Sequence, residues 1–289
     1  MERFNPLNDY LFLKVMGEEG DEEQCLAFLN AVLSDSSEKP LRLVKILENR
    51  SVSAENLGDK SVAFAFRAIG ETETQKNIKA EIEVQLKDLH NMTERTLYYW
   101  AREYAAGIKE GEDYSGLPRV ITINIVNFDH IKLEKFHTAF RLREDSRRDY
   151  VLTDVMEIHF VNMVKFRKKT NKQIDNTLER WLMFLDEYAT PDTLAEIVKI
   201  DPAIAKAQMR LEAVTANEEF RQNYELRRKA LSDWTTGVNT AFERGVEKGA
   251  EKERFEIAGS ALAKGLSVDF IQDLTGLKIE DIIALQNKK

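Results

Sequence analysis

Glutamate and glutamine alternate with apolar residues between Ile78 and Leu86, a pattern that could bind a metal ion or orient a water molecule. Every even position of this segment is apolar, whereas Glu81, Glu83 and Gln85 occupy odd positions. Because successive side chains of a β-strand point to opposite faces, these three polar groups would project in a row from one face. They belong either to a strand face in contact with water or to a functional site.

The neighbouring segment 61–68 (SVAFAFRA) favours a functional site. One parity of this predicted strand holds a valine and two phenylalanines, which indicates a face against the core. The other parity holds two consecutive alanines, Ala63 and Ala65, although alanine has a poor strand propensity. Small side chains opposite a row of carboxylates would leave a gap, and a residue of the size of aspartate would fill it.

Two carboxylates on adjacent strands, followed by a further polar side chain, suit the metal-assisted hydrolysis of a phosphodiester. A divalent cation polarises the phosphoryl oxygen and lowers the pKa of a bound water. Mg²⁺ prefers oxygen ligands in octahedral geometry and is usually held by one or two carboxylates together with waters. The segment 61–87 therefore predicts such a site with one carboxylate missing.

A series of short motifs runs along nearly the whole chain. They are NDYLFLK at 8–14, GDKS at 58–61, FRA at 66–68, EVQ at 83–85, Arg95 with Tyr98 and Tyr99, GEDY at 111–114 before VITINIVNF at 120–128, and TGL at 275–277. In this order they resemble the recombination-promoting nuclease and transposase family of the PD-(D/E)XK superfamily. The resemblance implies an α/β restriction-endonuclease-like core, with a mixed central sheet flanked by helices, and a C-terminal all-helical region.

The resemblance also implies roles for the strand pair. In this family the E-x-K of the superfamily becomes E-x-Q, so Glu83 would be a metal ligand and Gln85 would lie beside the attacking water. The family's first metal ligand is an aspartate just before the FRA ending of the preceding strand, and Ala65 holds that position here. Alanine offers no oxygen to a metal, so we expect a catalytically impaired chain. An engineered Asp→Ala change or a natural inactive relative would explain it, and the intact EVQ motif favours the former.

The activity that the resemblance implies is that of a metal-dependent DNA endonuclease. Its cofactor would be Mg²⁺, or Mn²⁺ or Ca²⁺, and its setting bacterial DNA recombination, mobile elements or phage defence. We expect DNA as the partner and a homodimer, because cutting a duplex needs two sites. The main alternative is a non-catalytic DNA-binding or protein-interaction relative on the same fold, and a structural scaffold with an acidic surface is a third.

Further residues are candidates for supporting roles. Asp9 on the first predicted helix and Glu81 beside Glu83 could support the site, although a helix-terminal charge and a solvated residue are equally simple explanations. The best candidate path for a DNA backbone is a basic stretch in the second half of the core. Its members are Arg141, Arg143, Lys165, Arg167 and Lys168. Acidic residues interrupt this stretch, so ordinary solvated turns are the alternative.

Periodicity predicts the elements that must position these groups. Helices are predicted at 8–16 and 22–33, and strands at 41–48, 61–68, 78–86, 120–128, 135–143 and 156–166. A helix from about residue 93 to residue 110 carries an apolar stripe, which we expect to face the core. The members of the stripe are Leu97, Trp100, Ala101, Tyr104, Ala105 and Ile108.

From residue 171 onward the pattern is helical. We predict a nuclease-like core at 1–170, a helical extension at 171–240, and a charged linker helix with a small helix-turn-helix-like tail at 241–289. Gly245 and Gly249 each cost about 1 kcal/mol in a helix, so the segment 241–256 predicts a weak, exposed helix or a linker. The last helix carries Glu280 and Asp281, which suit a packing or oligomerisation module better than a major-groove reader.

The composition of the 289 residues restricts the class of protein. They are 43% hydrophobic and 32% charged with a formal net charge of −8, which indicates a folded protein unsuited to wrapping nucleic acid non-specifically. Because the chain has no apolar run of about 20 residues and no signal-like N-terminus, we expect no membrane segment and a cytoplasmic location. Cys25 is the single cysteine and lies among apolar residues, which excludes an internal disulfide and predicts a buried thiol.

Overall fold

The computed structural model describes residues 3–34, 39–47, 65–88 and 90–287. The chain divides into two compact units, residues 1–230 and 231–289, each of which is described by itself. The GDKS motif and most of the strand predicted at 61–68 lie outside the described residues. The three-part division into 1–170, 171–240 and 241–289 stays a prediction. In the described part of the chain, no helix is both long and apolar enough to cross a membrane.

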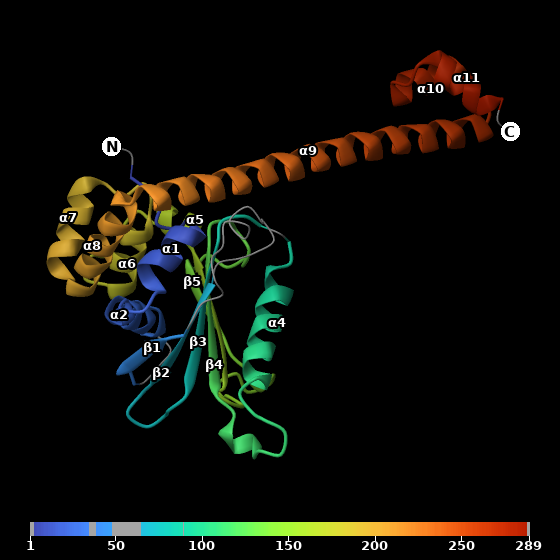
Figure 1. Ribbon diagram of the computed structural model, residues 1–289. Coiled ribbons are helices and arrows are strands. Elements are labelled where there is room, and N and C mark those ends of the chain that lie inside the picture. Colours follow the sequence, from blue (N-terminus) through green and yellow to red (C-terminus); the bar gives the residue numbers. More distant parts are fainter. Residues whose placement is uncertain (1–2, 35–38, 48–64, 89, 288–289) are drawn as a thin grey trace. The chain divides into compact units, whose positions relative to one another are not determined.

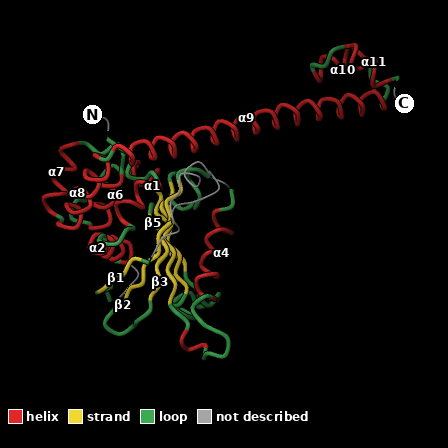
Figure 2. The backbone as a smooth tube through the Cα atoms, viewed as in Figure 1, coloured by secondary structure: helices red, strands yellow, loops and turns green. Residues whose placement is uncertain are grey.

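A mixed six-stranded sheet forms the centre of the first unit (Figure 2). Its strands are β1 (Leu43–Ile46), β2 (Ala65–Glu71), β3 (Ile78–Gln85), β4 (Arg119–Val126), β5 (His137–Phe140) and β6 (Met156–Asn162), in the order β1-β2-β3-β4-β6-β5. β3, β4 and β6 are parallel, and the other pairs are antiparallel. Gln85, Val126 and Asn162 are aligned in the register, so the parallel strands end together. We call this the C-terminal edge of the sheet.

Helices cover both faces of this sheet (Figure 1). One face is covered by α4 (Met92–Ala105), which forms the β3-α4-β4 crossover, and the loop after α4 contains a short 3₁₀ helix, η1 (Tyr114–Gly116). The other face supports the main helical layer of the unit. Its members are α1 (Asp9–Met16), α2 (Glu22–Leu33), α5 (Met163–Lys168), α6 (Thr177–Leu185), α7 (Pro191–Ile200), α8 (Pro202–Ala216) and the start of α9 (Glu218–Ala263). This arrangement confirms the predicted α/β class with a helical C-terminal region.

The main core lies between the sheet and the larger helical layer. The even-numbered residues of β3, among them Ile82, belong to this core, as their alternation predicted. Phe12 of α1 packs against Phe66 of β2 with ring centroids 5.8 Å apart. Cys25 of α2 is fully buried in the same cluster, where burial raises the pKa of its thiol. The structure therefore confirms that the even-numbered residues of β3 face the core and that Cys25 is a buried thiol.

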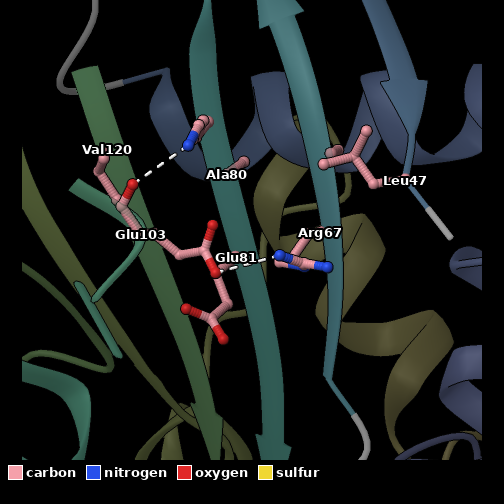
Figure 3. Close-up of a pocket in the computed structure, with 8 residues that line it drawn as sticks. Leu47, Arg67, Ala80, Glu81, Glu103 and Val120 are labelled. Atoms are coloured by element: carbon pink, nitrogen blue, oxygen red, sulfur yellow. Dashed lines mark hydrogen bonds and ion pairs between the residues drawn. The ribbon is translucent and has the colours of Figure 1, made fainter. Parts of the chain in front are cut away.

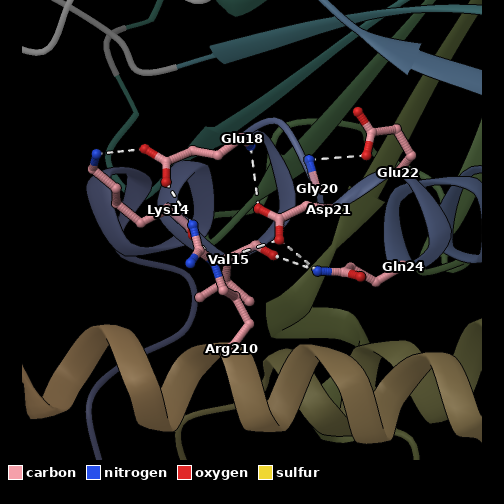
Figure 4. A network of polar contacts seen from close by, with 8 residues as sticks. All are labelled: Lys14, Val15, Glu18, Gly20, Asp21, Glu22, Gln24 and Arg210. Carbon is pink, nitrogen blue, oxygen red and sulfur yellow. Dashed lines mark hydrogen bonds and ion pairs between the residues drawn. The ribbon is translucent and has the colours of Figure 1, made fainter.

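A polar network joins α1 and α2 to α8 (Figure 4). Asp21, just before α2, accepts hydrogen bonds from the Glu18 backbone N–H at 3.2 Å and from Gln24 Nε2 at 2.8 Å. Arg210 of α8 approaches Asp21 to 3.5 Å and donates to Glu18 at 2.7 Å. Burial nevertheless raises the pKa of Asp21 to about 6, and Arg210 opposes this rise. Asp21 is thus a buried acid, and its partners in the network only partly compensate for its loss of hydration.

α4 differs from its prediction in length and in the face that it turns to the sheet. It ends at Ala105 rather than near residue 110, and the predicted apolar stripe does not face the core, since Leu97 is 43% exposed. Thr96 and Glu103 are buried instead. The reason is that the sheet face beneath α4 is polar, and the Thr96 hydroxyl donates to Asn124 Oδ1 at 3.0 Å. A polar sheet face requires a polar helix face above it.

The strand predicted at 156–166 is divided into β6 and α5. Asn162 ends β6, and its side chain accepts a hydrogen bond from the Lys165 backbone N–H at 3.0 Å. An asparagine side chain in this position caps a helix N-terminus, which turns the chain into α5. The strand prediction was therefore wrong for residues 163–166, where apolar residues continue from the strand into the helix.

The second unit consists of the later part of α9, α10 (Val268–Thr275) and α11 (Ile279–Gln286). Residues 241–256 are helical and mostly exposed, which agrees with the first of the two forms predicted for them. α10 ends at Gly276, whose φ of 68° is left-handed. A small core holds this unit together, and it consists of Ala258, Ala261, Ile271, Leu277 and Ile282.

Candidate active site

The polar face of β3 is buried beneath α4. Glu81 is 7% exposed and Glu83 is 4% exposed, so the interpretation of this row as a solvated strand face is wrong. The β3-α4-β4 crossover explains the burial, because α4 starts near the C-terminal edge and returns over the strand it has just left. Burying two carboxylates is unfavourable unless charge or hydrogen bonds compensate, so their surroundings determine what the site can do.

The register of β2 and β3 relates Glu83 to position 65. Ala65 is the direct antiparallel partner of Glu83, and Arg67 is the partner of Glu81. Residues directly opposite one another in an antiparallel pair lie on the same face of the sheet, with Cβ atoms about 5 Å apart. The register therefore pairs position 65 with Glu83 across the two strands.

Arg95 of α4 is the cation nearest to Glu83. Its Nη2 atom lies 2.7 Å from Glu83 Oε1, but the geometry is not that of a hydrogen bond. Among the described residues, neither of these two atoms has another hydrogen-bond partner. Burial raises the pKa of Glu83, whereas Arg95 lowers it and Asp9 raises it further. Desolvation thus outweighs the attraction of the guanidinium.

Asp9 lies close enough to Glu83 to affect its charge, and it has a strong partner of its own. Arg227 of α9 donates to Asp9 from Nη2 at 2.6 Å and from Nε at 3.1 Å. Both side chains are at least nine-tenths buried. Asp9 is therefore held beside the site by a two-point ion pair with a residue 218 positions away, rather than acting only as a helix-terminal charge.

Gln85 lies where β3 ends, at the C-terminal edge of the sheet. Its side chain is partly buried and donates from Nε2 to the backbone carbonyl of Lys87 at 3.2 Å. The backbone N–H of Asn127 donates to the Gln85 carbonyl at 3.1 Å, which joins the ends of β3 and β4. The amide of Gln85 thus stands next to the strand ends, two residues along from Glu83.

Glu81 belongs to a separate charged cluster in a small pocket on the same face (Figure 3). Its carboxylate lies close to that of Glu103 of α4, which pairs with Arg67 at 3.2 Å, while Lys79 donates to the Glu103 carbonyl at 3.1 Å. Burial raises the pKa of Glu81 to about 7, and the neighbouring carboxylates of Glu103 and Glu83 add to the rise. Glu81 is therefore a buried carboxylate that lies next to the carboxylate of Glu103.

The five predicted DNA-contacting residues lie near two opposite edges of the sheet. Lys165 and Arg167 of α5 lie near the C-terminal edge, where Arg167 donates to Asn127 Oδ1 at 2.6 Å. Arg141 follows β5 toward the opposite edge and donates to Glu157 at 2.5 Å. Lys165, Arg167 and Arg141 contact acceptors within the protein. Lys168 and Arg143 are exposed, and Arg143 donates to the Arg148 carbonyl at 2.6 Å. The structure thus brings only the α5 residues to the edge where Gln85 lies.

The sequence analysis assigned no role in the site to its two arginines, Arg95, which appeared only as part of a family motif, and Arg227. A signal for Arg95 existed, because Arg95, Tyr99 and Arg102 are spaced by four and three residues and therefore share one helix face. No local pattern pointed to Arg227. It lies in a segment predicted as a helical extension, and only the tertiary fold places it against Asp9.

Comparison with known protein families identifies a match. A family model described as PD-(D/E)XK nuclease family transposase matches residues 6–241, which include the whole sheet, α4 and Arg227. No curated protein and no solved structure matches the chain. The matched segment is more than half of the 289 residues and contains every group described above. The chain belongs to the PD-(D/E)XK nuclease family transposases.

Proposed function

We propose that this protein is a DNA-binding member of its family whose site for metal-dependent phosphodiester hydrolysis lacks one carboxylate. The observation that carries the proposal is the register of β2 and β3, in which Ala65 stands directly opposite the buried Glu83. In the complete site, the residue at 65 and Glu83 would hold the cation, and the Gln85 amide would orient the attacking water. Family membership supports the nuclease chemistry and DNA as the substrate.

The residues present in this chain do not fit a divalent cation. Mg²⁺ sites use one or two carboxylates that are free to bind, together with waters. Here Glu83 lies 2.7 Å from the Arg95 guanidinium, and both oxygens of Asp9 accept hydrogen bonds from Arg227. Among the described residues, no group of three or more His, Cys, Asp or Glu is arranged to hold a metal. We therefore expect the chain with Ala65 to bind DNA without cutting it.

Replacing the alanine tests the proposal directly. In the Ala65→Asp variant we expect plasmid nicking with Mg²⁺ or Mn²⁺ at a rate at least about 100-fold above the parent chain, because the added carboxylate completes the cation site. Calorimetric titration with Mn²⁺ should show a binding site in this variant that the parent lacks. If the variant neither binds metal nor cuts plasmid with any divalent cation, the nuclease proposal is wrong.

Two control variants make this test specific. Ala65→Asn adds a side chain of nearly the same size without the charge, so it shows whether position 65 tolerates the volume. Ala65→Asp combined with Glu83→Gln removes the second ligand and should return nicking to background. Equal nicking by the single and the double variant would mean that the cleavage arises elsewhere.

The non-catalytic alternative also has an observation in its favour. The Arg95–Glu83 contact gives the site a permanent cation, as expected for a protein that uses the fold for binding alone. An Ala65→Asp variant that folds but gains no metal affinity would support this alternative. A scaffold with no role at DNA predicts that the parent chain shows no salt-dependent DNA binding. A duplex cut by one complex requires two sites, so we propose a homodimer for the active form.

A further inference from the structure

The Arg95 guanidinium is buried without the hydrogen bonds that such a group normally makes. Its side chain is 12% exposed, and in the described part of the chain its Nε and Nη2 atoms donate no hydrogen bond. A buried guanidinium with unused N–H groups is unfavourable, because it has lost water without gaining acceptors. Glu83 neutralises its charge from 2.7 Å but does not align with these N–H groups.

The ring of Tyr99 determines how the guanidinium is presented. Tyr99 lies one turn further along α4, and the Arg95 guanidinium carbon is 5.4 Å from the centre of its ring. A cation over an aromatic ring is attracted by the ring face without a hydrogen-bond acceptor, so this contact leaves the Nε and Nη2 N–H groups of Arg95 unsatisfied. A planar set of donors of this kind matches the oxygens of a phosphate better than a lysine does.

The position of Arg95 is also suited to a phosphate. It lies in the first turn of α4, near the C-terminal edge of the sheet, and beside the strand pair of Ala65 and Glu83. If a DNA backbone passes this edge, the phosphate nearest to Glu83 needs a cation that offsets the repulsion between the two negative groups. Arg95 is already at that place.

We propose that Arg95 receives a DNA phosphate at this site and that Glu83 holds Arg95 in place in the DNA-free protein. The inference rests on the proposed DNA-binding function. It adds Arg95 as a residue that contacts DNA. Glu83 and the phosphate compete for the same guanidinium. Arg95 is thus a phosphate-binding residue, and its contact with Glu83 is exchanged when DNA binds.

The competition predicts opposite effects for the two members of the pair. The test uses the full parent chain and measures fluorescence anisotropy of a short labelled duplex in EDTA, at several salt concentrations. Arg95→Met should weaken binding about tenfold and lower the slope of log affinity against log salt by about 1, because one phosphate contact is lost. Glu83→Gln should strengthen binding about threefold to tenfold, because Arg95 loses its internal competitor. The double variant should bind as weakly as Arg95→Met.

Arg102 offers a matched control on the same helix. It stacks on the same Tyr99 ring at 4.9 Å and faces a carboxylate, Glu81, at 4.0 Å. Arg102→Met removes the same charge from α4, and Glu81→Gln neutralises the matching acid. We expect both to change DNA affinity by less than about twofold, since Arg102 and Glu81 lie further from the C-terminal edge of the sheet than Arg95 and Glu83 do.

The outcomes separate this inference from the proposed function. If Glu83→Gln does not strengthen binding, or if Arg95→Met and Arg102→Met weaken it equally, Arg95 is only a structural partner and the inference is wrong while DNA binding stands. Absence of salt-dependent binding by the parent chain would overturn the proposed function and this inference with it. Arg95→Lys keeps the charge and should retain most of the salt slope with weaker affinity, so it distinguishes loss of the contact from misfolding.

Discussion

Glu83 and Glu157 lie on opposite faces of one sheet, and these two buried carboxylates differ in how many hydrogen bonds they accept. Glu157 of β6 is fully buried and accepts hydrogen bonds from Arg119 and Arg141 at 2.5 Å each and from His159 at 3.0 Å. Glu83 is 4% exposed and has one cation nearby, which is not aligned for hydrogen bonding. The two residues are almost equally buried, so the difference lies in their partners.

The difference is the one expected between a structural carboxylate and the functional carboxylate that we propose for Glu83. Glu157 joins the start of β4 to the segment after β5, and any new ligand would have to replace well-aligned donors. Glu83 has little to lose if its partner changes, because its desolvation is already poorly compensated. A group that must exchange partners during binding should be incompletely satisfied at rest, and Glu83 meets that condition.

The largest expected effect is on the stability of the Glu157 cluster. Glu157→Gln should lower the free energy of unfolding by about 3–5 kcal/mol, because it removes the counter-charge of Arg119 and Arg141, whose side chains are only 10% and 18% exposed. Glu83→Gln, the matched change on the other face, should leave stability unchanged or raise it, because the fold disfavours the charged form of this residue. Urea unfolding followed by tryptophan fluorescence measures both. Equal losses for the two variants would remove the distinction drawn between them.

Asp21 is an intermediate case whose effect appears in the pH dependence. Its pKa is raised from 3.8 to about 6 by burial, so the folded state binds the proton more tightly than the unfolded chain. This group therefore adds stability that is fully present below pH about 3.8 and is lost as the pH rises through about 6. Over that window its contribution should fall by at most about 3 kcal/mol. Asp21→Asn should flatten the dependence, as measured by urea unfolding at several pH values.

The matched control for Asp21 is Glu22, the next acidic residue along the chain, which is partly exposed. Its carboxylate accepts a hydrogen bond from the Gly20 backbone N–H in an exposed position. Glu22→Gln keeps the Asp21 carboxylate in place, so the fall of stability with rising pH should persist, slightly reduced because the Glu22 charge adds to the rise in the pKa of Asp21. If Asp21→Asn leaves the slope as steep as in the parent, the buried carboxylate is better compensated by Arg210 than its surroundings indicate.

The sequence predicted the strand pair because alternation with period two is a local property. The polar parity of β3 and the apolar parity beneath it follow from counting residues along the strand, whereas the family motif before FRA identified position 65. The family motifs added the meaning of that position. What alternation could not give was the environment, because a row of polar side chains looks the same whether water or a helix covers it.

The orientation of α4 and the pairing of Asp9 with Arg227 could not be predicted from local sequence patterns. The apolar stripe with Leu97 satisfied the usual rule for a helix on a core, but the sheet beneath is polar and binds Thr96 instead. Helix orientation depends on the surface it meets, and that surface comes from other segments. Arg227 meets Asp9 across 218 residues, a pairing that no periodicity records.

The smallest expected effect extends the same comparison to the cations. Lys165 and Arg167 contact internal acceptors, and their exposed neighbour Lys168 lies with them on α5 near the C-terminal edge. Arg143 is also exposed, but it donates to the Arg148 carbonyl at 2.6 Å and lies toward the other edge. A DNA backbone that reaches Glu83 from the C-terminal edge would pass Lys168 and not Arg143. The basic residues at 141–143 and those at 165–168 lie at opposite edges of the sheet, because β5 and β6 run in opposite directions.

Reversing one charge at each edge distinguishes the two paths. Lys168→Glu should weaken binding to a short duplex about threefold to tenfold and reduce the salt slope by about 1, because a phosphate contact is lost and a repulsion is added. Arg143→Glu makes a charge change of the same size and should alter affinity by less than about twofold. Anisotropy titrations at several salt concentrations measure both. A larger effect from Arg143 would place the DNA at the opposite edge, away from Glu83, and would separate DNA binding from the candidate active site.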